Sequence, residues 1–143
     1  GDVIVVEAGD DEMAVAGGNV CAIAQRNGVA GLVVDGVIRD VGESRANLFP
    51  VFARGASPIP AKRGGGGDMN ATIRCGGVVV NPGDVVVADE EGVVVVPRAQ
   101  AMDVLARAQA RVATDSAMTL EAWEKRHRAA VEAALSAKGY RLS

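Results

Sequence analysis

Aromatic residues are scarce in this sequence: they make up 3% of its 143 residues, although 49% of the residues are hydrophobic. Valine, alanine and glycine must therefore build most of the core, because few large side chains are available to fill it. Val-rich segments favour buried strands, and Ala-rich segments favour helices that pack on them. The composition thus predicts an α/β fold, and the length suits one domain with a sizeable core.

Cysteine, positive charge and long apolar runs are scarce as well. The two cysteines, Cys21 and Cys75, show neither CxxC nor Cys/His spacing, which excludes a disulfide framework and predicts buried, reduced thiols. A net charge of −3 argues against a basic nucleic-acid groove. No apolar run approaches the roughly 20 residues of a membrane span. We therefore expect a cytoplasmic protein that binds neither nucleic acid nor a membrane.

The apolar pattern predicts mixed strands followed by a helical tail. Residues 3–7 and 31–35 are typical of buried strands and flank a helix over 17–26, and such a strand–helix–strand unit implies parallel pairing. Val20, Ile23 and Ala24 would form the buried face of this helix. Further elements are expected as a short helix at 39–48, strands at 51–53, 71–75, 78–80, 84–88 and 93–96, and helices at 99–113 and 119–139.

These elements predict a core over residues 1–97 and a C-terminal helical extension of the same domain over 98–143. The first apolar strand starts almost at the first residue, and such a strand needs neighbours on both sides. We therefore expect the domain to have a further N-terminal portion. The last helix carries an apolar stripe, which would be buried in the core or between subunits. Its residues are Leu120, Trp123, Val131 and Leu135.

A glycine pair opens the first predicted helix, in the run Gly17, Gly18, Asn19 and Val20. The first amides of a helix have no partner within it, and they lie at the positive end of the helix dipole, so they form a ready site for an anion. Glycine also allows a ligand to come close to the backbone. The alternative is a plain turn and helix cap, for which Gly and Asn are common residues.

Arg39 and Asp40 follow the second predicted strand, and open α/β sheets place their ligands at the carboxyl ends of strands. The guanidinium suits a substrate carboxylate, and the carboxylate suits a divalent cation. Alternatively, the two residues form a solvated ion pair, or Asp40 caps the next helix. The crossover is expected to bring Arg39 and Asp40 to the same edge of the sheet as residues 17–20.

Three blocks of sequence resemble the RraA-like family: "GGNVCAIAQRNGVAGLVVDGVIRD", "FPVFARG" and "CGGVVVNPGDVVVADEEGVVVVP". The family includes 4-hydroxy-4-methyl-2-oxoglutarate aldolases, 4-carboxy-4-hydroxy-2-oxoadipate aldolases, oxaloacetate decarboxylases and the regulator of ribonuclease activity A. The likeness runs in unbroken order from Gly1 to about Pro97. It implies a swivelling β/β/α domain that forms trimers, or hexamers built from trimers, and that has a further N-terminal portion.

The resemblance also implies roles for individual residues. The family's helix start binds the substrate through Gly17, Gly18, Asn19 and Val20, and the arginine of its Arg-Asp pair, here Arg39, binds substrate as well. The aspartate, here Asp40, binds Mg²⁺ or Mn²⁺. This chain departs from the aldolase branch at Gly18, where that branch has an acidic residue that helps to hold the water shell of the metal. Asp40 is then the only matched metal carboxylate.

Two functions follow from the resemblance. The first is a metal-dependent lyase that cleaves a carbon–carbon bond in a small 2-oxo acid, by retro-aldol reaction or decarboxylation, through a pyruvate enolate. Arg39 would be the catalytic residue. The second is a protein that, like the ribonuclease regulator, binds a protein partner without catalysis. The substrate, the general base and the effect of Gly18 on aldolase activity are left open by the sequence.

Overall fold

A three-stranded parallel sheet forms the centre of the first of two units into which the chain divides, Gly1–Ala101 and Met102–Ser143. The structure is a computed structural model and describes residues 1–9, 11–62 and 66–140. The strands β1 (Val3–Glu7), β2 (Gly31–Ile38) and β3 (Val51–Ala56) lie in the order β1-β2-β3. Both pairings are parallel, which confirms the predicted strand–helix–strand unit and the α/β class.

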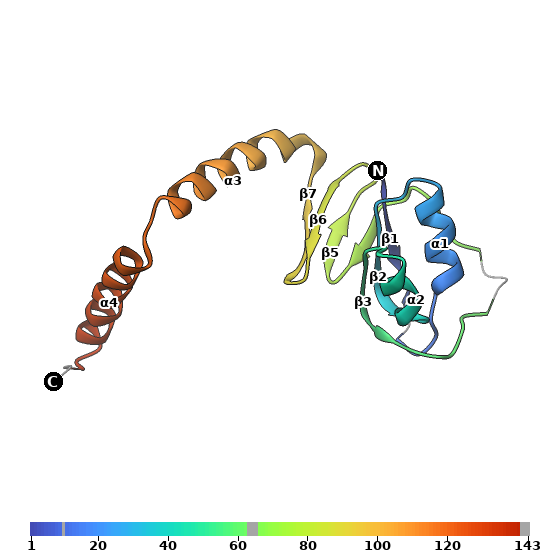
Figure 1. Ribbon diagram of the computed structural model, residues 1–143, viewed down its shortest axis with the longest axis horizontal. Coiled ribbons are helices and arrows are strands. Elements are labelled where there is room, and N and C mark those ends of the chain that lie inside the picture. The colour runs from blue at the N-terminus through green and yellow to red at the C-terminus, as the bar shows by residue number, and fades with distance from the viewer. Residues whose placement is uncertain (10, 63–65, 141–143) are drawn as a thin grey trace. The chain divides into compact units, whose positions relative to one another are not determined.

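Two helices, α1 (Gly18–Arg26) and α2 (Val41–Ala46), lie on one side of this sheet (Figure 1). The central strand β2 is buried along nearly its whole length, because helices cover one face and hairpins face the other. The buried cluster on the helix side combines small and aliphatic residues, as the composition predicts; it consists of Ala16, Cys21, Leu32, Val34, Ile38 and Phe49.

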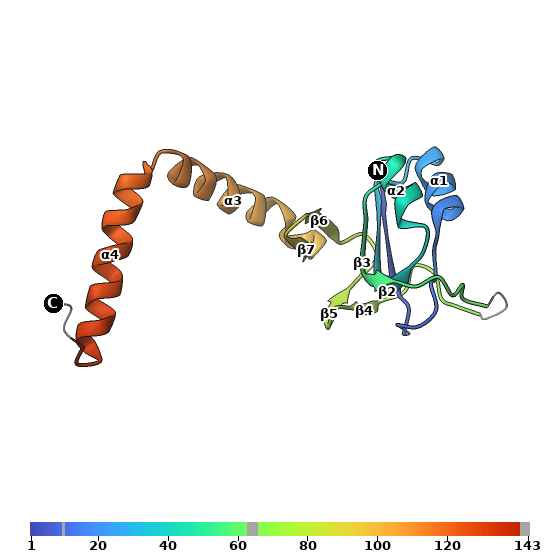
Figure 2. The same ribbon diagram turned by 60° about the horizontal axis from the view of Figure 1, so that its bottom comes forward.

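Two antiparallel hairpins lie on the other side of the sheet, as both ribbon views show (Figures 1 and 2). They are formed by β4 (Ile73–Cys75) with β5 (Val78–Val80), and by β6 (Val85–Asp89) with β7 (Gly92–Val96). Valine side chains of the sheet and of both hairpins line a hollow of about 490 Å³. The four short strands follow the predicted strand segments closely.

The second unit consists of two amphipathic helices that bury none of their own residues. A 3₁₀ turn at Arg98–Gln100 leads into α3 (Ala101–Ser116), and α4 (Leu120–Ala137) follows. Thr119 caps α4, because its hydroxyl accepts a hydrogen bond from the Ala122 amide at 3.2 Å. Over residues 1–9, 11–62 and 66–140, no helix is both long and apolar enough to span a membrane.

The prediction for the buried face of α1 is wrong in part. Val20 and Ile23 are 53% and 60% exposed, whereas Gly18 and Cys21 are buried and Ala24 is half-buried. The helix approaches the residues that follow β2 so closely that only small side chains fit between them. The larger apolar residues therefore point outward.

One smaller expectation also needs correction. Cys21 is buried as predicted, with 1% of its surface exposed, but Cys75 is only half-buried. The apolar stripe on α4 is exposed within the chain, at 78% for Leu120 and 45% for Trp123. His127 stacks on the Trp123 ring with centroids 4.7 Å apart.

Candidate functional site

The end of β2 and the start of α1 meet at one edge of the sheet. The backbone continues from Ile38 into Arg39, whose amide donates a hydrogen bond to the Ala16 carbonyl at 2.9 Å. This bond holds the segment before α1 beside the segment after β2. The structure thereby brings the predicted helix start and the predicted Arg-Asp pair together.

Asp40 has an unusual backbone conformation that decides where its side chain goes. It occupies the N-cap position of α2 with φ of 56° and ψ of 39°, in the left-handed region, which Asp and Asn tolerate better than most residues. The carboxylate makes no capping bond to its own helix. Instead, Oδ2 accepts a hydrogen bond from the Gly18 amide at 3.1 Å.

The carboxylate of Asp40 makes both of its contacts through the same oxygen. The Arg39 guanidinium Nε lies 3.4 Å from Oδ2, and the Gly18 amide bonds to Oδ2 as well. Oδ1 has no partner among the residues that the structure describes. About a third of the Asp40 side chain is exposed, and 42% of the Arg39 side chain. One carboxylate oxygen thus makes both polar contacts, while the other makes none with the described residues.

The glycine pair is required by these close approaches. Gly17 and Gly18 are buried, and a Cβ at Gly17 would lie 2.5 Å from Asp40 Oδ2 and 2.8 Å from Arg39 Cγ. A Cβ at Gly18 would overlap the carboxylate of Glu43, a residue of α2 that the sequence reasoning missed. Three charged side chains therefore lie directly on bare backbone at the start of α1.

The start of α1 offers backbone N–H donors, although the carboxylates of Asp40 and Glu43 already lie against Gly18. The helix has no acidic residue in its first turn and no side-chain cap at Gly17. Its first amides point out of the helix without internal partners. Within the described residues, the Gly18 amide bonds to Asp40, and no partner is recorded for the Asn19 and Val20 amides. The helix dipole and the Arg39 guanidinium both favour a negative group beside them.

The oxygen donors at this edge fit a hard divalent cation, such as Mg²⁺ or Mn²⁺, better than a softer metal that prefers Cys or His ligands. No group of three or more His, Cys, Asp or Glu residues in the described part of the chain could hold a metal. Mg²⁺, however, commonly binds through one or two carboxylates and keeps several waters. Asp40 supplies one such carboxylate, because its Oδ1 has no partner in the part of the chain that the structure describes.

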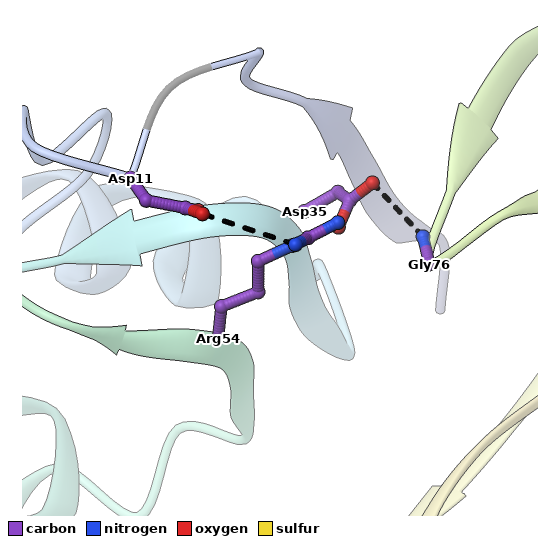
Figure 3. Close-up of polar contacts among 4 residues, drawn as sticks. All are labelled: Asp11, Asp35, Arg54 and Gly76. Carbon is purple, nitrogen blue, oxygen red and sulfur yellow. Dashed lines mark hydrogen bonds and ion pairs between the residues drawn. The ribbon is translucent and has the colours of Figure 1, made fainter.

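A second polar cluster, which the sequence reasoning also missed, lies on the hairpin side of the sheet (Figure 3). Asp35 of β2 accepts one hydrogen bond from Arg54 Nε and another, at 2.9 Å, from the Gly76 amide. Arg54 also lies 3.8 Å from Asp11. The side chain of Asp35 is only 14% exposed. These contacts tie β2, β3 and the β4–β5 turn together.

The charge of Asp35 is stabilised in this cluster. The hydrogen bond from Arg54, followed by the one from the Gly76 amide, lowers the pKa of Asp35 below its usual value. Arg54 has its pKa raised by the same pair. Both residues fall within the sequence blocks quoted above, so the resemblance pointed to these segments but gave them no role. With its carboxylate occupied on both oxygens, Asp35 is an anchor of the fold rather than a free ligand.

The fold and the site define a class: an α/β domain with a glycine-rich helix start beside an Arg-Asp pair at the end of a parallel strand. The RraA-like family, described as Aldolase/RraA, matches residues 1–95. The chain belongs to this family, which confirms the resemblance and the predicted fold.

Among curated relatives, the chain is 47% identical over 118 residues to a protein of Halalkalibacterium halodurans that carries the name "Putative 4-hydroxy-4-methyl-2-oxoglutarate aldolase". That match covers 82% of this chain and 56% of the relative. A protein of Albidiferax ferrireducens with the same name is 42% identical over 66% of this chain and 55% of its own length. The chain thus spans little more than half the length of these relatives.

Solved structures of the family share the fold. The RraAS2 protein of Streptomyces coelicolor, described as an unusual member of the RNase ES inhibitor RraA family, matches with a TM-score of 0.72 and 34% identity. That match covers 90% of this chain and 62% of the other. The RNA-processing inhibitor RraA from Thermus matches with a TM-score of 0.63 and 34% identity, over 66% of this chain and 58% of the other.

Proposed function

We propose that this chain carries the site of a divalent-metal-dependent carbon–carbon lyase that acts on small 2-oxo acids. The observation that carries the proposal is the convergence of Arg39, Asp40 and the Gly17–Gly18 helix start at one edge of the sheet. The guanidinium and the unpaired amides can bind a short carboxylate, and the Asp40 carboxylate can hold a divalent cation. The names of the aldolase relatives support the same reaction class.

The helix start and Arg39 would bind the substrate. The amides of Asn19 and Val20 would donate hydrogen bonds to the substrate carboxylate, and the helix dipole favours the negative charge there. The planar fork of Arg39 can donate two parallel hydrogen bonds to a carboxylate or to a keto oxygen beside it. Together these donors would fix the position of the 2-oxo group relative to Asp40.

Cleavage of the carbon–carbon bond leaves an electron pair on one product, and the site must stabilise it. When the C3–C4 bond, one carbon beyond the keto carbon, breaks by retro-aldol cleavage or loss of CO₂, its electrons move into the pyruvate unit and give an enolate, which a proton then converts to pyruvate. In the retro-aldol reaction, the C4 hydroxyl also loses its proton to a base as its carbon becomes a carbonyl. Arg39 would stabilise the negative charge that develops on the enolate oxygen. A divalent cation held by Asp40 would supply further stabilisation of that oxygen as a Lewis acid. Both cleavages lead to the same enolate, so one site could perform either.

A second function has support from the structural relatives. The RraA proteins of Thermus and Streptomyces coelicolor are described as inhibitors of RNA processing or of RNase ES, which favours a protein-binding regulator without catalysis. We propose the lyase first, because Arg39, the Asp40 carboxylate and the unpaired amides at the start of α1 would together bind a small molecule. A protein surface would have no need of them.

An assay of pyruvate release separates the two functions. The full chain is incubated with oxaloacetate, and separately with 4-hydroxy-4-methyl-2-oxoglutarate, in the presence of Mg²⁺ or Mn²⁺ and again with EDTA. The lyase proposal expects pyruvate above the rate of metal alone, and loss of that excess with EDTA. Release that equals the rate of metal alone for both substrates would leave the regulator as the better function.

A further inference from the structure

Glu43 lies at the same edge as Asp40, three residues further along the chain. It belongs to α2, where residues three apart lie on the same face of the helix. A Cβ built at Gly18 would overlap Glu43 Oε2 and would lie 2.8 Å from its Cδ and 3.0 Å from its Cβ. The Glu43 side chain thus packs directly against the α-carbon of Gly18.

Asp40 and Glu43 have the spacing of a helix-capping pair, but they are not used as one. In a capping box, the side chain of the first residue bonds to the amide of the fourth, and the fourth reaches back to the first. Here the Asp40 side chain makes no capping bond. In the part of the chain that the structure describes, the Glu43 carboxylate has neither a hydrogen-bond nor an ion-pair partner. Both side chains turn toward α1 instead.

Two carboxylates therefore converge on Gly18, one at its amide and one over its α-carbon. Two like charges placed near each other repel, and the arrangement gains stability when a cation lies between them. Arg39 offers its Nε to Asp40 Oδ2, while Asp40 Oδ1 and the Glu43 carboxylate have no cationic partner among the described residues. Two such carboxylates have the oxygen chemistry that a hard divalent cation prefers.

We propose that Glu43 is the second carboxylate of the cation site, and that it contacts the same divalent ion as Asp40 or a water molecule bound to that ion. The proposal rests on the lyase function above and adds a metal-positioning residue to it. It also explains Gly18. A side chain at position 18 would fill the space that Glu43 occupies.

Direct measurement of Mn²⁺ binding tests the proposal without relying on turnover. The full chain, Glu43→Gln and Asp40→Asn are titrated with Mn²⁺ alone, and free Mn²⁺ is followed by electron paramagnetic resonance. Glu91→Gln, in the β6–β7 turn, is the matched control for loss of one negative charge. We expect Glu43→Gln to weaken Mn²⁺ binding at least about tenfold, the usual effect of removing a residue that orients a metal ligand or its water. Glu91→Gln should bind like the wild type.

The results distinguish this inference from the proposed function. If Asp40→Asn loses Mn²⁺ and pyruvate release while Glu43→Gln binds Mn²⁺ like the wild type, the role of Glu43 is wrong and the lyase site stands. If the wild-type chain binds no Mn²⁺ and releases no pyruvate, both proposals fail. Circular dichroism and thermal unfolding of each variant show whether a loss of binding reflects a loss of fold.

A double substitution tests whether an acid at position 18 can replace Glu43 in binding the same ion. Gly18→Asp alone should disturb the site, because its side chain would collide with Glu43. Combined with Glu43→Ala, which removes the colliding carboxylate group, it returns a carboxylate to the start of α1. We expect the double variant to bind Mn²⁺ several-fold more tightly than Glu43→Ala alone. Binding no tighter than that of Glu43→Ala would contradict the claim that the two positions serve one ion.

Discussion

The carboxylate of Asp40 accepts a hydrogen bond from the amide of Gly18 at 3.1 Å, across 22 residues of sequence. This bond joins the end of the central strand to the start of the first helix. It also uses one carboxylate oxygen only. The left-handed backbone of Asp40 makes it possible, because that conformation turns the side chain away from the helix that the residue would otherwise cap.

Asp40→Asn and Asp40→Ala should separate the backbone role of this residue from its charge. Asn tolerates the left-handed conformation, so Asp40→Asn should keep most of the stability but lose Mn²⁺ binding and metal-dependent turnover. Asp40→Ala should lose both functions and also about 1 kcal/mol of unfolding free energy, because Ala adopts positive φ at a cost. Urea unfolding and pyruvate release measure the two effects. Turnover in Asp40→Asn at the wild-type rate would contradict a metal role.

The glycine pair should be intolerant of even one added methyl group. In Gly17→Ala, the new Cβ would meet Arg39 and Asp40, which must move, so turnover should fall at least about tenfold, or roughly 1.4 kcal/mol in barrier. Gly42→Ala in α2 is the matched control. Its Cβ meets nothing within 4 Å, and the change should raise helix stability by about 0.5–1 kcal/mol. Steady-state kinetics and thermal unfolding of both variants give the comparison.

The Asp35–Arg54 pair should make the stability of the fold depend on pH in the acid range. The pKa of Asp35 is lowered in the folded state from its usual 3.8, so the folded protein holds this carboxylate charged more firmly than the unfolded chain does. Its contribution is present above the unfolded pKa and is lost as the pH falls through the lower folded pKa. Unfolding free energies below about pH 4 should therefore fall less steeply in Asp35→Asn than in the wild type.

Arg54→Met supplies the second arm of this test. If the pair couples, the double variant Asp35→Asn/Arg54→Met should be more stable than the sum of the two single changes predicts. Strict additivity, together with an unchanged pH dependence in Asp35→Asn, would show that the pair adds nothing measurable. Because Arg54 is about half exposed, a small coupling energy is expected.

The strands of the first unit could be predicted because Val-rich runs between turn residues are typical of buried strands. Their parallel order followed from the helix between the first two. The buried face of α1 could not be predicted from apolar periodicity. That pattern favours large side chains, such as Val20 and Ile23, whereas the contact with Arg39 and Asp40 admits only small ones.

The candidate site could be predicted in part for a similar reason. Strand ends and helix starts locate Gly17, Gly18, Arg39 and Asp40, and the structure brings them together. The sequence did not indicate a role for Glu43. The direction of its side chain depends on the left-handed backbone of Asp40, which a sequence does not reveal. Its spacing from Asp40 predicts a capping pair instead. The roles of these residues in binding and catalysis remain predictions.

The exposed apolar stripe on α4 leads to a prediction about assembly. Leu120 is 78% exposed and Trp123 is 45% exposed, and contiguous apolar surface of this kind commonly marks an interface. We predict that the complete protein forms a trimer, or a multiple of one, as its family resemblance implies. Light scattering after size exclusion at micromolar concentration checks this. A monodisperse monomer would contradict it, and Trp123→Glu should shift a true oligomer toward smaller species.

Arg39 gives the sharpest test of the lyase site. Its guanidinium lies over Gly17 and beside Asp40, where it would bind the substrate carboxylate and the enolate oxygen. Arg39→Lys keeps the charge but loses the planar fork, so turnover on oxaloacetate should fall at least about tenfold, or roughly 1.4 kcal/mol in barrier. Arg39→Ala should be worse. Mn²⁺ binding should survive in both variants, because Asp40 and Glu43 remain.

Arg45→Lys is the matched control, because Arg45 is an exposed arginine of the neighbouring α2. It should behave like the wild type in turnover and in Mn²⁺ binding. If Arg39 merely forms a surface ion pair, Lys would replace it with little loss, because such pairs contribute about 1 kcal/mol or less. Wild-type kinetics in Arg39→Lys would therefore assign the Arg-Asp pair to structure. If turnover falls in Arg39→Lys but not in Arg45→Lys, the planar geometry of the Arg39 guanidinium takes part in the reaction.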